Sequence, residues 1–93
     1  MKDKNGLYYY PYPSDRKTRV YVRKGPGDVE FRLWREEHPE VWERHPWLCY
    51  SVVQSAAEMY KESGTGSDPL ILYDRNVADA LLKEEDRAVA KRG

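Results

Sequence analysis

The sequence predicts an α+β fold: a small single domain in which an N-terminal antiparallel β-hairpin, of two or three strands, packs against an amphipathic helix and a C-terminal helical segment. Two observations predict this class. Apolar residues alternate with polar ones at the period of a strand in the first third of the chain, and they recur at the period of a helix further on. The length of 93 residues suits one domain. We expect a single domain over residues 1–93, with frayed ends at residues 1–6 and 87–93.

Aromatic residues supply the core area that aliphatic residues do not. Ile, Leu, Val and Phe number only 17 of 93 residues, a share typical of disordered chains. The net charge of zero and the 12 aromatic residues indicate instead a folded chain. Each large ring buries roughly 150–250 Å². We therefore expect an aromatic-rich core.

The hairpin consists of Thr18–Lys24 and Asp28–Arg35, joined by the strong turn signal Gly25-Pro26-Gly27. The alternation gives it one apolar face and one cationic and aromatic face. The apolar face carries Val20, Val22, Val29, Phe31 and Leu33. The opposite face carries Arg19, Tyr21, Arg23, Glu30, Arg32 and Trp34.

Leu7–Tyr12 is either a third strand or an irregular arm. Its β-forming tyrosines favour a strand, but Pro11 and Pro13 restrict it to the edge of a sheet, because proline lacks the N–H that a central strand needs.

Two His-Pro steps are expected to start helices, since proline is tolerated in the first helical turn. Pro46 also disfavours helical backbone at His45, so Pro39–Arg44 is expected to be one short helical turn.

The clearest element is an amphipathic helix from about Pro46 to Glu62. At 100° per residue its apolar side chains fall within one arc of roughly 140°. These residues are Leu48, Cys49, Val52, Val53, Ala56, Met59 and Tyr60. Ser63-Gly64 is a typical helix end. The arc needs an apolar surface to cover it, and the apolar face of the hairpin is the one available.

The last third begins with a loop over residues 64–69, in which Asp68 can cap a helix that starts at Pro69. Leu70–Tyr73 is either a buried strand or helical, because period cannot decide so short a run. Asn76 is a second candidate cap. The helical stripe after it consists of Val77, Ala80, Leu81 and Ala88, with Leu82 at its margin.

Charge is balanced overall but not along the chain. Residues 1–35 carry nine basic and four acidic residues, whereas residues 36–68 carry two basic and seven acidic ones. The zero net charge argues against a uniformly cationic binder of nucleic acid or membranes, but it allows a local cationic face. No apolar run approaches the roughly 20 residues of a membrane span, so we expect no membrane association.

Cys49 is the only cysteine, so no internal disulfide can form. Small secreted domains usually need such staples, and the polar start of the chain does not resemble a secretory leader. We therefore expect a cytoplasmic protein.

The sequence predicts no metal site, no other cofactor and no catalytic activity. His38, His45 and Cys49 have uneven spacing and offer three ligands, where structural zinc sites normally have four. Cys49 falls inside the apolar arc, where a cysteine usually acts as a small hydrophobe. No phosphate-binding or nucleophile motif occurs in the chain.

The sequence thus predicts a small non-catalytic interaction module that binds a protein partner or a second copy of itself, for example as a homodimer. Tyr, Trp and Arg are enriched at interface hot spots, and the chain is rich in them. The alternative is binding of single-stranded nucleic acid by the cationic and aromatic hairpin face, where rings could stack on bases. In both cases the candidate binding face is Arg19, Tyr21, Arg23, Arg32 and Trp34.

Overall fold

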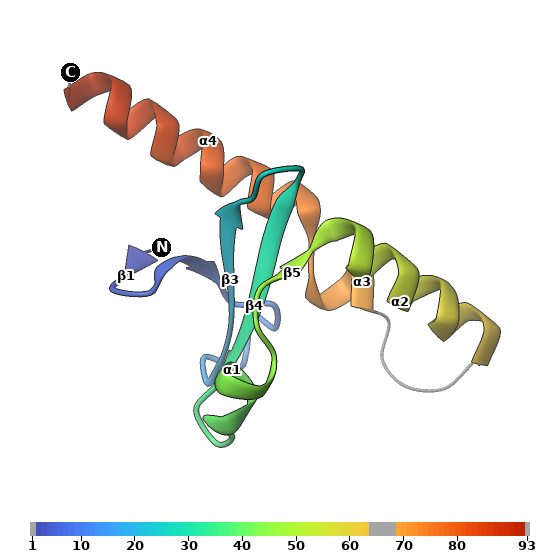
Figure 1. Cartoon of the computed structure of the whole chain (residues 1–93). Helices are drawn as coiled ribbons and strands as arrows, with labels where there is room; N and C mark the ends of the chain where they lie inside the picture. Colours follow the sequence, from blue (N-terminus) through green and yellow to red (C-terminus); the bar gives the residue numbers. More distant parts are fainter. Residues whose placement is uncertain (1, 64–68, 93) are drawn as a thin grey trace.

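A computed structural model describes residues 2–63 and 69–92 of the chain and confirms the α+β class. Its strands form one antiparallel sheet in the order β1-β2-β3-β4-β5 (Figure 1). The strands are β1 (Lys2–Asp3), β2 (Gly6–Tyr9), β3 (Thr18–Lys24), β4 (Val29–Arg35) and β5 (Leu48–Cys49). The helices are α1 (Glu40–Arg44), α2 (Tyr50–Ser63), α3 (Pro69–Leu72) and α4 (Arg75–Arg92).

The predicted hairpin is confirmed as β3 and β4. Val20 pairs with Leu33 and Val22 with Phe31, so the apolar side chains of both strands share one face. The Gly25 N–H donates to the Asp28 carbonyl oxygen at 3.0 Å and closes the turn. A Cβ atom at Gly25 would lie 2.6 Å from that oxygen, so the turn needs glycine there.

The segment Leu7–Tyr12, which was expected to be a third strand or an irregular arm, is a strand only in its first part, where it belongs to β2. β2 pairs with β3 and ends at Tyr9, before the two prolines. It also pairs with β1, so the expectation of an edge strand was wrong: the prolines lie beyond the strand and do not limit its pairing. Gly6, with a φ of 126°, makes the reversal between β1 and β2. Lys2–Asp3 is therefore paired strand and α4 reaches Arg92, while fraying of the two ends stays a prediction.

The second His-Pro step does not start a helix, so that prediction was wrong. α1 ends at Arg44 with His45 in extended backbone, as expected. Leu48 and Cys49, however, pair with Phe31 and Glu30 as strand β5, and α2 begins only at Tyr50. The open edge of β4 supplies hydrogen-bond partners to residues that helical period alone would place in the helix.

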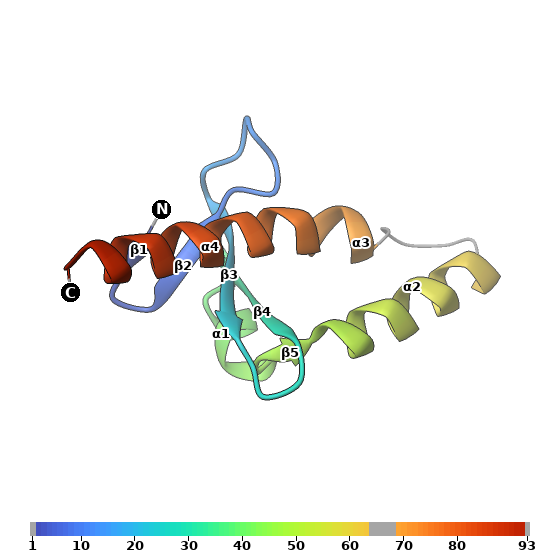
Figure 2. The ribbon, with the colours of Figure 1, turned by 90° about the horizontal axis from the view of Figure 1, so that it is seen from above.

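Helix α4 covers most of the apolar face of the sheet, and α2 contributes mainly through its start (Figure 2). The buried core consists of Tyr9, Val20, Val22, Val29, Phe31, Val53 and Ala78. On α2, Val53 and Ala57 are buried, but Val52 is 48% and Met59 69% exposed. The expectation that the whole apolar arc of this helix faces the hairpin was therefore wrong: the side with Val53 and Ala57 packs on the core, and the side with Val52 and Met59 does not.

The last third is helical. Residues 70–72 belong to α3, which begins at Pro69 as expected, while the expected cap Asp68 lies outside the described residues. α4 is capped by Asp74 and not by Asn76: the Asp74 carboxylate accepts the N–H groups of Asn76 and Val77 at 2.9 and 3.3 Å.

The apolar stripe of α4 is shifted by comparison with the predicted one. Ala78 is fully buried, whereas Ala80 is exposed. Val77, Leu81 and Leu82 pack against the core. The side chain of Ala88 lies outside the described residues.

Candidate interaction face

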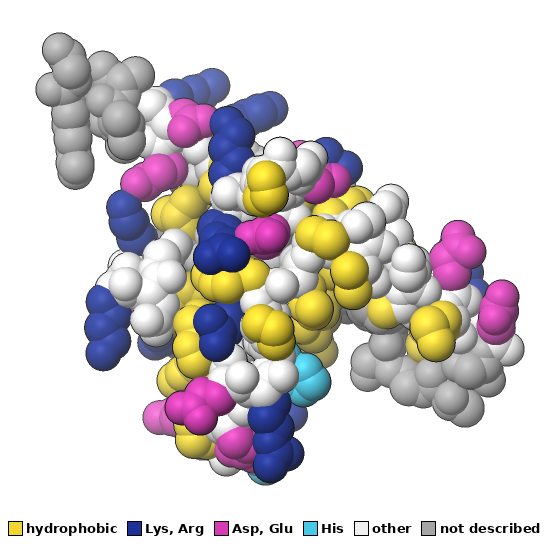
Figure 3. Space-filling view, in the orientation of Figure 1, with side chains coloured by type: hydrophobic (Ala, Val, Ile, Leu, Met, Phe, Trp, Pro, Cys, Tyr) yellow, Lys and Arg dark blue, Asp and Glu magenta, His cyan; other side chains and the backbone are white. Residues whose placement is uncertain are grey.

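The cationic and aromatic side chains of the hairpin lie together on the face of the sheet that α4 leaves open (Figure 3). The register of β3 and β4 sets Arg19 opposite Trp34 and Tyr21 opposite Arg32. Arg23 lies opposite Glu30. The predicted residues Arg19, Tyr21, Arg23, Arg32 and Trp34, together with Tyr8, Trp42 and Trp47, which pack on them, form what we call the arginine–aromatic face.

Arg19 is held between two rings. Its guanidinium carbon lies 4.7 Å from the ring centroid of Tyr8 and 4.7 Å from that of Trp34. Both distances are within the range of cation–π attraction. Arg19 Nη1 also lies 3.2 Å from Asp3 Oδ2, and its Nε is buried without a hydrogen bond among the described residues. The charge of Arg19 is thus stabilised by two rings and one carboxylate.

Arg32 is fixed by helix α1. Its guanidinium carbon lies 3.9 Å from the ring centroid of Trp42, and its Nε donates to the Trp42 carbonyl oxygen at 3.0 Å. A second guanidinium nitrogen, Nη2, donates to the same oxygen. Arg32 therefore binds both the ring and the backbone of one residue, a geometry that a lysine cannot reproduce.

Arg23 is the more accessible of these cations. Its guanidinium carbon lies 4.3 Å from the ring centroid of Trp47, and its Nε donates to Glu30 Oε1 at 2.5 Å. About half of its side chain is exposed. Trp47 also contacts Trp42 edge to face, with 6.3 Å between centroids, so the stack continues from one arginine to the next.

Tyr21 lies at the centre of this face and is only 1% exposed. The rings of Tyr8 and Trp42 lie 5.3 and 5.1 Å from it. Its hydroxyl donates to Asp3 Oδ2 at 2.5 Å. Tyr21 therefore positions its neighbours and does not itself present a surface to a partner.

Asp3 is the anionic centre beneath these groups. Its desolvation acts to raise the pKa, but hydrogen bonds from the Tyr21 hydroxyl and the Asn5 N–H, together with the charge of Arg19, hold the pKa of Asp3 below its usual value. Burial, followed by the hydrogen bond to Asp3, raises the pKa of Tyr21. The Asp3 carboxylate is thus ionised and the Tyr21 hydroxyl protonated at neutral pH.

Sequence reasoning missed Trp42, Trp47 and Asp3 as members of this face. Trp42 comes from α1 and Trp47 from the segment before β5, so no strand alternation connects them to the hairpin. Strand alternation therefore carries no signal that could have found them.

Among the residues that the structure describes, no group of three or more His, Cys, Asp or Glu side chains could hold a metal ion. His38 Nδ1 lies 3.1 Å from Glu40 Oε1. Cys49 is not a buried hydrophobe, and that prediction was wrong: it is partly exposed on β5, with its Sγ 3.0 Å from Ser51 Oγ. The hydrogen bond with Ser51, followed by one from the backbone of Val52, lowers the pKa of Cys49.

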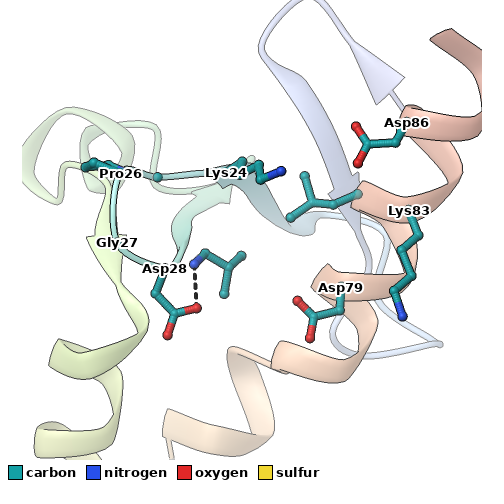
Figure 4. Close-up of a pocket in the computed structure, with 10 residues that line it drawn as sticks. Lys24, Pro26, Gly27, Asp28, Asp79, Lys83 and Asp86 are labelled. Carbon is teal, nitrogen blue, oxygen red and sulfur yellow. Dashed lines mark hydrogen bonds between the residues drawn. The ribbon is translucent and has the colours of Figure 1, made fainter. Parts of the chain in front are cut away.

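A hollow of about 460 Å³ lies between the β3–β4 turn and α4 (Figure 4). Its charged lining residues are Lys24, Asp28, Asp79, Lys83 and Asp86. Arg75 Nη2 lies 3.2 Å from Asp28 and its Nε 3.8 Å from Asp79, so two of these carboxylates already have a cationic partner. The group therefore ties the turn to α4.

Comparisons of the chain with protein-family models, with curated proteins and with solved structures found no match. Within the described parts of the chain, none of the helices has the length and apolar character to span a bilayer. The fold and the arginine–aromatic face define a small α+β domain with a preorganised cationic and aromatic surface.

Proposed function

We propose that this chain is a non-catalytic interaction module that binds a partner protein in the cytoplasm through the arginine–aromatic face. The observation that supports the proposal is the stacking of Arg19, Arg23 and Arg32 on aromatic rings, each guanidinium lying 3.9–4.7 Å from at least one ring centroid. Such stacking fixes side chains that are usually mobile. These side chains then lose less conformational entropy when a partner binds.

The residue types also fit a protein interface. Trp, Tyr and Arg dominate interface hot spots, because they combine large apolar area with a polar group. Trp34 and Trp47 are partly exposed, and Arg23, which stacks on Trp47, has about half of its side chain exposed. These three side chains belong to the part of the face that a partner can reach, whereas Tyr21 is covered.

A non-catalytic role agrees with the polar groups that the structure describes. The hydrogen-bond partner of Cys49 is a serine hydroxyl, not an imidazole that could act as a base. Two of the three carboxylates that line the turn hollow, those of Asp28 and Asp79, are paired with Arg75. The cytoplasmic part of the proposal is supported by the single cysteine.

Nucleic-acid binding is the second candidate. It is favoured by an exposed cation next to the face: the guanidinium carbon of Arg16 lies 5.6 Å from the ring centroid of Tyr10, which in turn contacts the ring of Tyr8. It is disfavoured because Asp3 and Glu30 pair with Arg19 and Arg23. Carboxylates inside a basic face reduce the potential that would attract phosphates. A protein partner is therefore the better fit.

The test uses variants of reachable residues, because Arg19 and Arg32 hold the fold together. The wild-type chain and Trp34→Ala, Arg23→Ala and Arg44→Ala variants are compared for capture of proteins from the native host and for binding of fluorescent single-stranded oligonucleotides. We expect one captured protein to be lost with the first two variants and kept with Arg44→Ala, which removes an exposed arginine at the end of α1.

The oligonucleotide arm decides between the two candidates. Nucleic-acid binding at low salt that weakens with added salt and with Arg23→Ala supports the second candidate and contradicts the first. A captured protein that all variants retain equally contradicts the assignment of the face. Circular dichroism of each variant separates loss of binding from loss of structure.

A further inference from the structure

Helix α2 carries two rows of apolar side chains, and the core covers only one of them. Val53 and Ala57 are buried, while Val52, Ala56 and Met59 are exposed. These three occupy positions i, i+4 and i+7, so they share one side of the helix. Hydrophobic side chains lie along the visible side of α2 in Figure 3. We call Val52, Ala56 and Met59 the outer stripe.

We propose that the outer stripe is the interface through which two copies of this chain associate, with their α2 helices antiparallel and crossing at Ala56. The inference is independent of the partner proposed for the arginine–aromatic face. Ala56 has the smallest side chain of the stripe, so it allows two helix axes to approach to about 8–10 Å. With Ala56 on the two-fold axis, Met59 of each copy lies level with Val53 of the other copy and about 1.5 Å, along the helix axis, from the level of Val52.

The surface of the chain supports a second copy as the occupant. Its accessible surface is 6684 Å² for a mass of 11.0 kDa, about 1,000 Å² more than the roughly 5,600 Å² that a monomer of this mass exposes. The radius of gyration of 14.0 Å also exceeds the value of about 12 Å for a compact domain of this length. A standard interface covers about 800 Å² on each partner. The whole chain thus exposes more surface than a compact monomer of its mass, by about the area that one such interface covers on each partner.

The charges of α2 select the antiparallel arrangement. Residues 50–57 carry no charge, and all three charged residues, Glu58, Lys61 and Glu62, lie in the second half of the helix. Parallel helices would bring each of these glutamates against its own copy. Antiparallel helices place Glu62 instead at the level of Tyr50 and Ser51 of the other copy, where the helix N-terminus has no acidic residue of its own.

Sedimentation of the whole chain from micromolar to near-millimolar concentration tests the association. We expect a monomer–dimer equilibrium that Val52→Glu and Met59→Glu each weaken at least tenfold. Gln54→Glu is the matched control, since it adds the same charge to an exposed position about 170° around the helix from the stripe. A monomer at every concentration, or a dimer equally sensitive to all three variants or to none, overturns the proposal.

Cross-linking tests the register without adding charge to the stripe. In a Cys49→Ser background, Ala56→Cys should form a disulfide-linked dimer on oxidation, because the two residues meet at the axis. Met59→Cys should not, since antiparallel helices separate its two copies by roughly 9 Å along the axis, too far for a disulfide. Equal cross-linking of both variants, or none of Ala56→Cys, contradicts the antiparallel arrangement. Partner capture by the arginine–aromatic face should survive Val52→Glu, so the two proposals can fail separately.

Discussion

The hydroxyl of Tyr9 donates a hydrogen bond to the carbonyl oxygen of Leu72 at 2.7 Å. The same hydroxyl accepts the backbone N–H of Asp74 at 2.8 Å. One side chain of β2 thus satisfies two backbone groups between α3 and α4, more than 60 residues away along the chain. These two bonds hold the start of α4 against the sheet, and α4 covers the apolar face.

Replacing Tyr9 with Phe should therefore destabilise the protein although the ring remains. The change leaves the Leu72 carbonyl and the Asp74 N–H without their partner in a partly buried place. We expect a loss of about 1–3 kcal/mol in the free energy of unfolding. Urea denaturation followed by tryptophan fluorescence measures it.

Tyr12→Phe is the control for this hydroxyl. Tyr12 is 42% exposed, so its variant should change the free energy of unfolding by no more than about 0.5 kcal/mol. Equal stability of the Tyr9→Phe variant and the wild type would show that water replaces both bonds, and it would contradict the role given to Tyr9.

The hairpin could be predicted because the residues that determine it lie close together in the sequence. Alternation along β3 and β4 and the Gly25-Pro26-Gly27 turn together determine which side chains share a face, and the register of Val20 with Leu33 follows from them. The prediction of a helix starting at Pro46 failed because the deciding partner is remote. Leu48 pairs with Phe31, which lies 17 residues earlier in the chain. The spacing of apolar residues around Leu48 fits a helix and gives no indication of that pairing.

Asp74 shows a second limit of local reasoning. Asp74 and Asn76 are both good N-cap residues, and the sequence does not decide between them. The structure decides, because Tyr9 binds the N–H of Asp74 and thereby sets where the helix starts. The position of the cap is a consequence of tertiary packing.

Replacing each of the two candidate caps with alanine tests which of them caps α4. Asp74→Ala removes the acceptor for the N–H groups of Asn76 and Val77 and should cost about 1 kcal/mol of stability. Asn76→Ala leaves those bonds in place and should be near neutral. Thermal unfolding of both variants measures the difference in stability. A larger loss of stability for Asn76→Ala would contradict Asp74 as the N-cap and would indicate that α4 begins after Asn76.

The strand residues of the candidate face could be predicted from the sequence, but the residues that pack on them could not. Alternation alone places Arg19, Arg23 and Arg32 on one side of the hairpin. It does not show that Trp42 and Trp47 arrive from outside the hairpin to stack on them. As a result Tyr21, a candidate contact residue by its strand position, is covered on that side.

The stacking of Arg32 predicts a difference between two conservative substitutions. Arg32→Lys keeps the charge but loses the planar stack on Trp42 and the paired hydrogen bonds to its carbonyl oxygen. We expect it to lower the free energy of unfolding by about 1–2 kcal/mol. Arg35→Lys, at an exposed position at the end of β4, should be neutral. Chemical denaturation of the two variants compares them, and equal effects would contradict the fixed position of Arg32.

Asp3 is expected to make the free energy of unfolding depend on pH in the acidic range. Because its folded pKa lies below its unfolded value, the ionised carboxylate stabilises the fold fully above the unfolded pKa of about 3.9, and this contribution is lost as pH falls through the lower, folded pKa. Asp3→Asn should therefore reduce stability at pH 7 by about 1 kcal/mol, a modest figure because the pair with Arg19 is partly exposed.

The gap between wild type and Asp3→Asn should then narrow as the pH is lowered below about 4, where the wild-type carboxyl also becomes neutral. Urea denaturation at a series of pH values measures the gap. Glu36→Gln, which alters an exposed carboxyl just after β4, should show no such convergence. A constant gap for Asp3→Asn across the series would mean that the hydrogen bond from Tyr21 stabilises the fold independently of the charge on Asp3, and that Arg19 is held by its two rings alone.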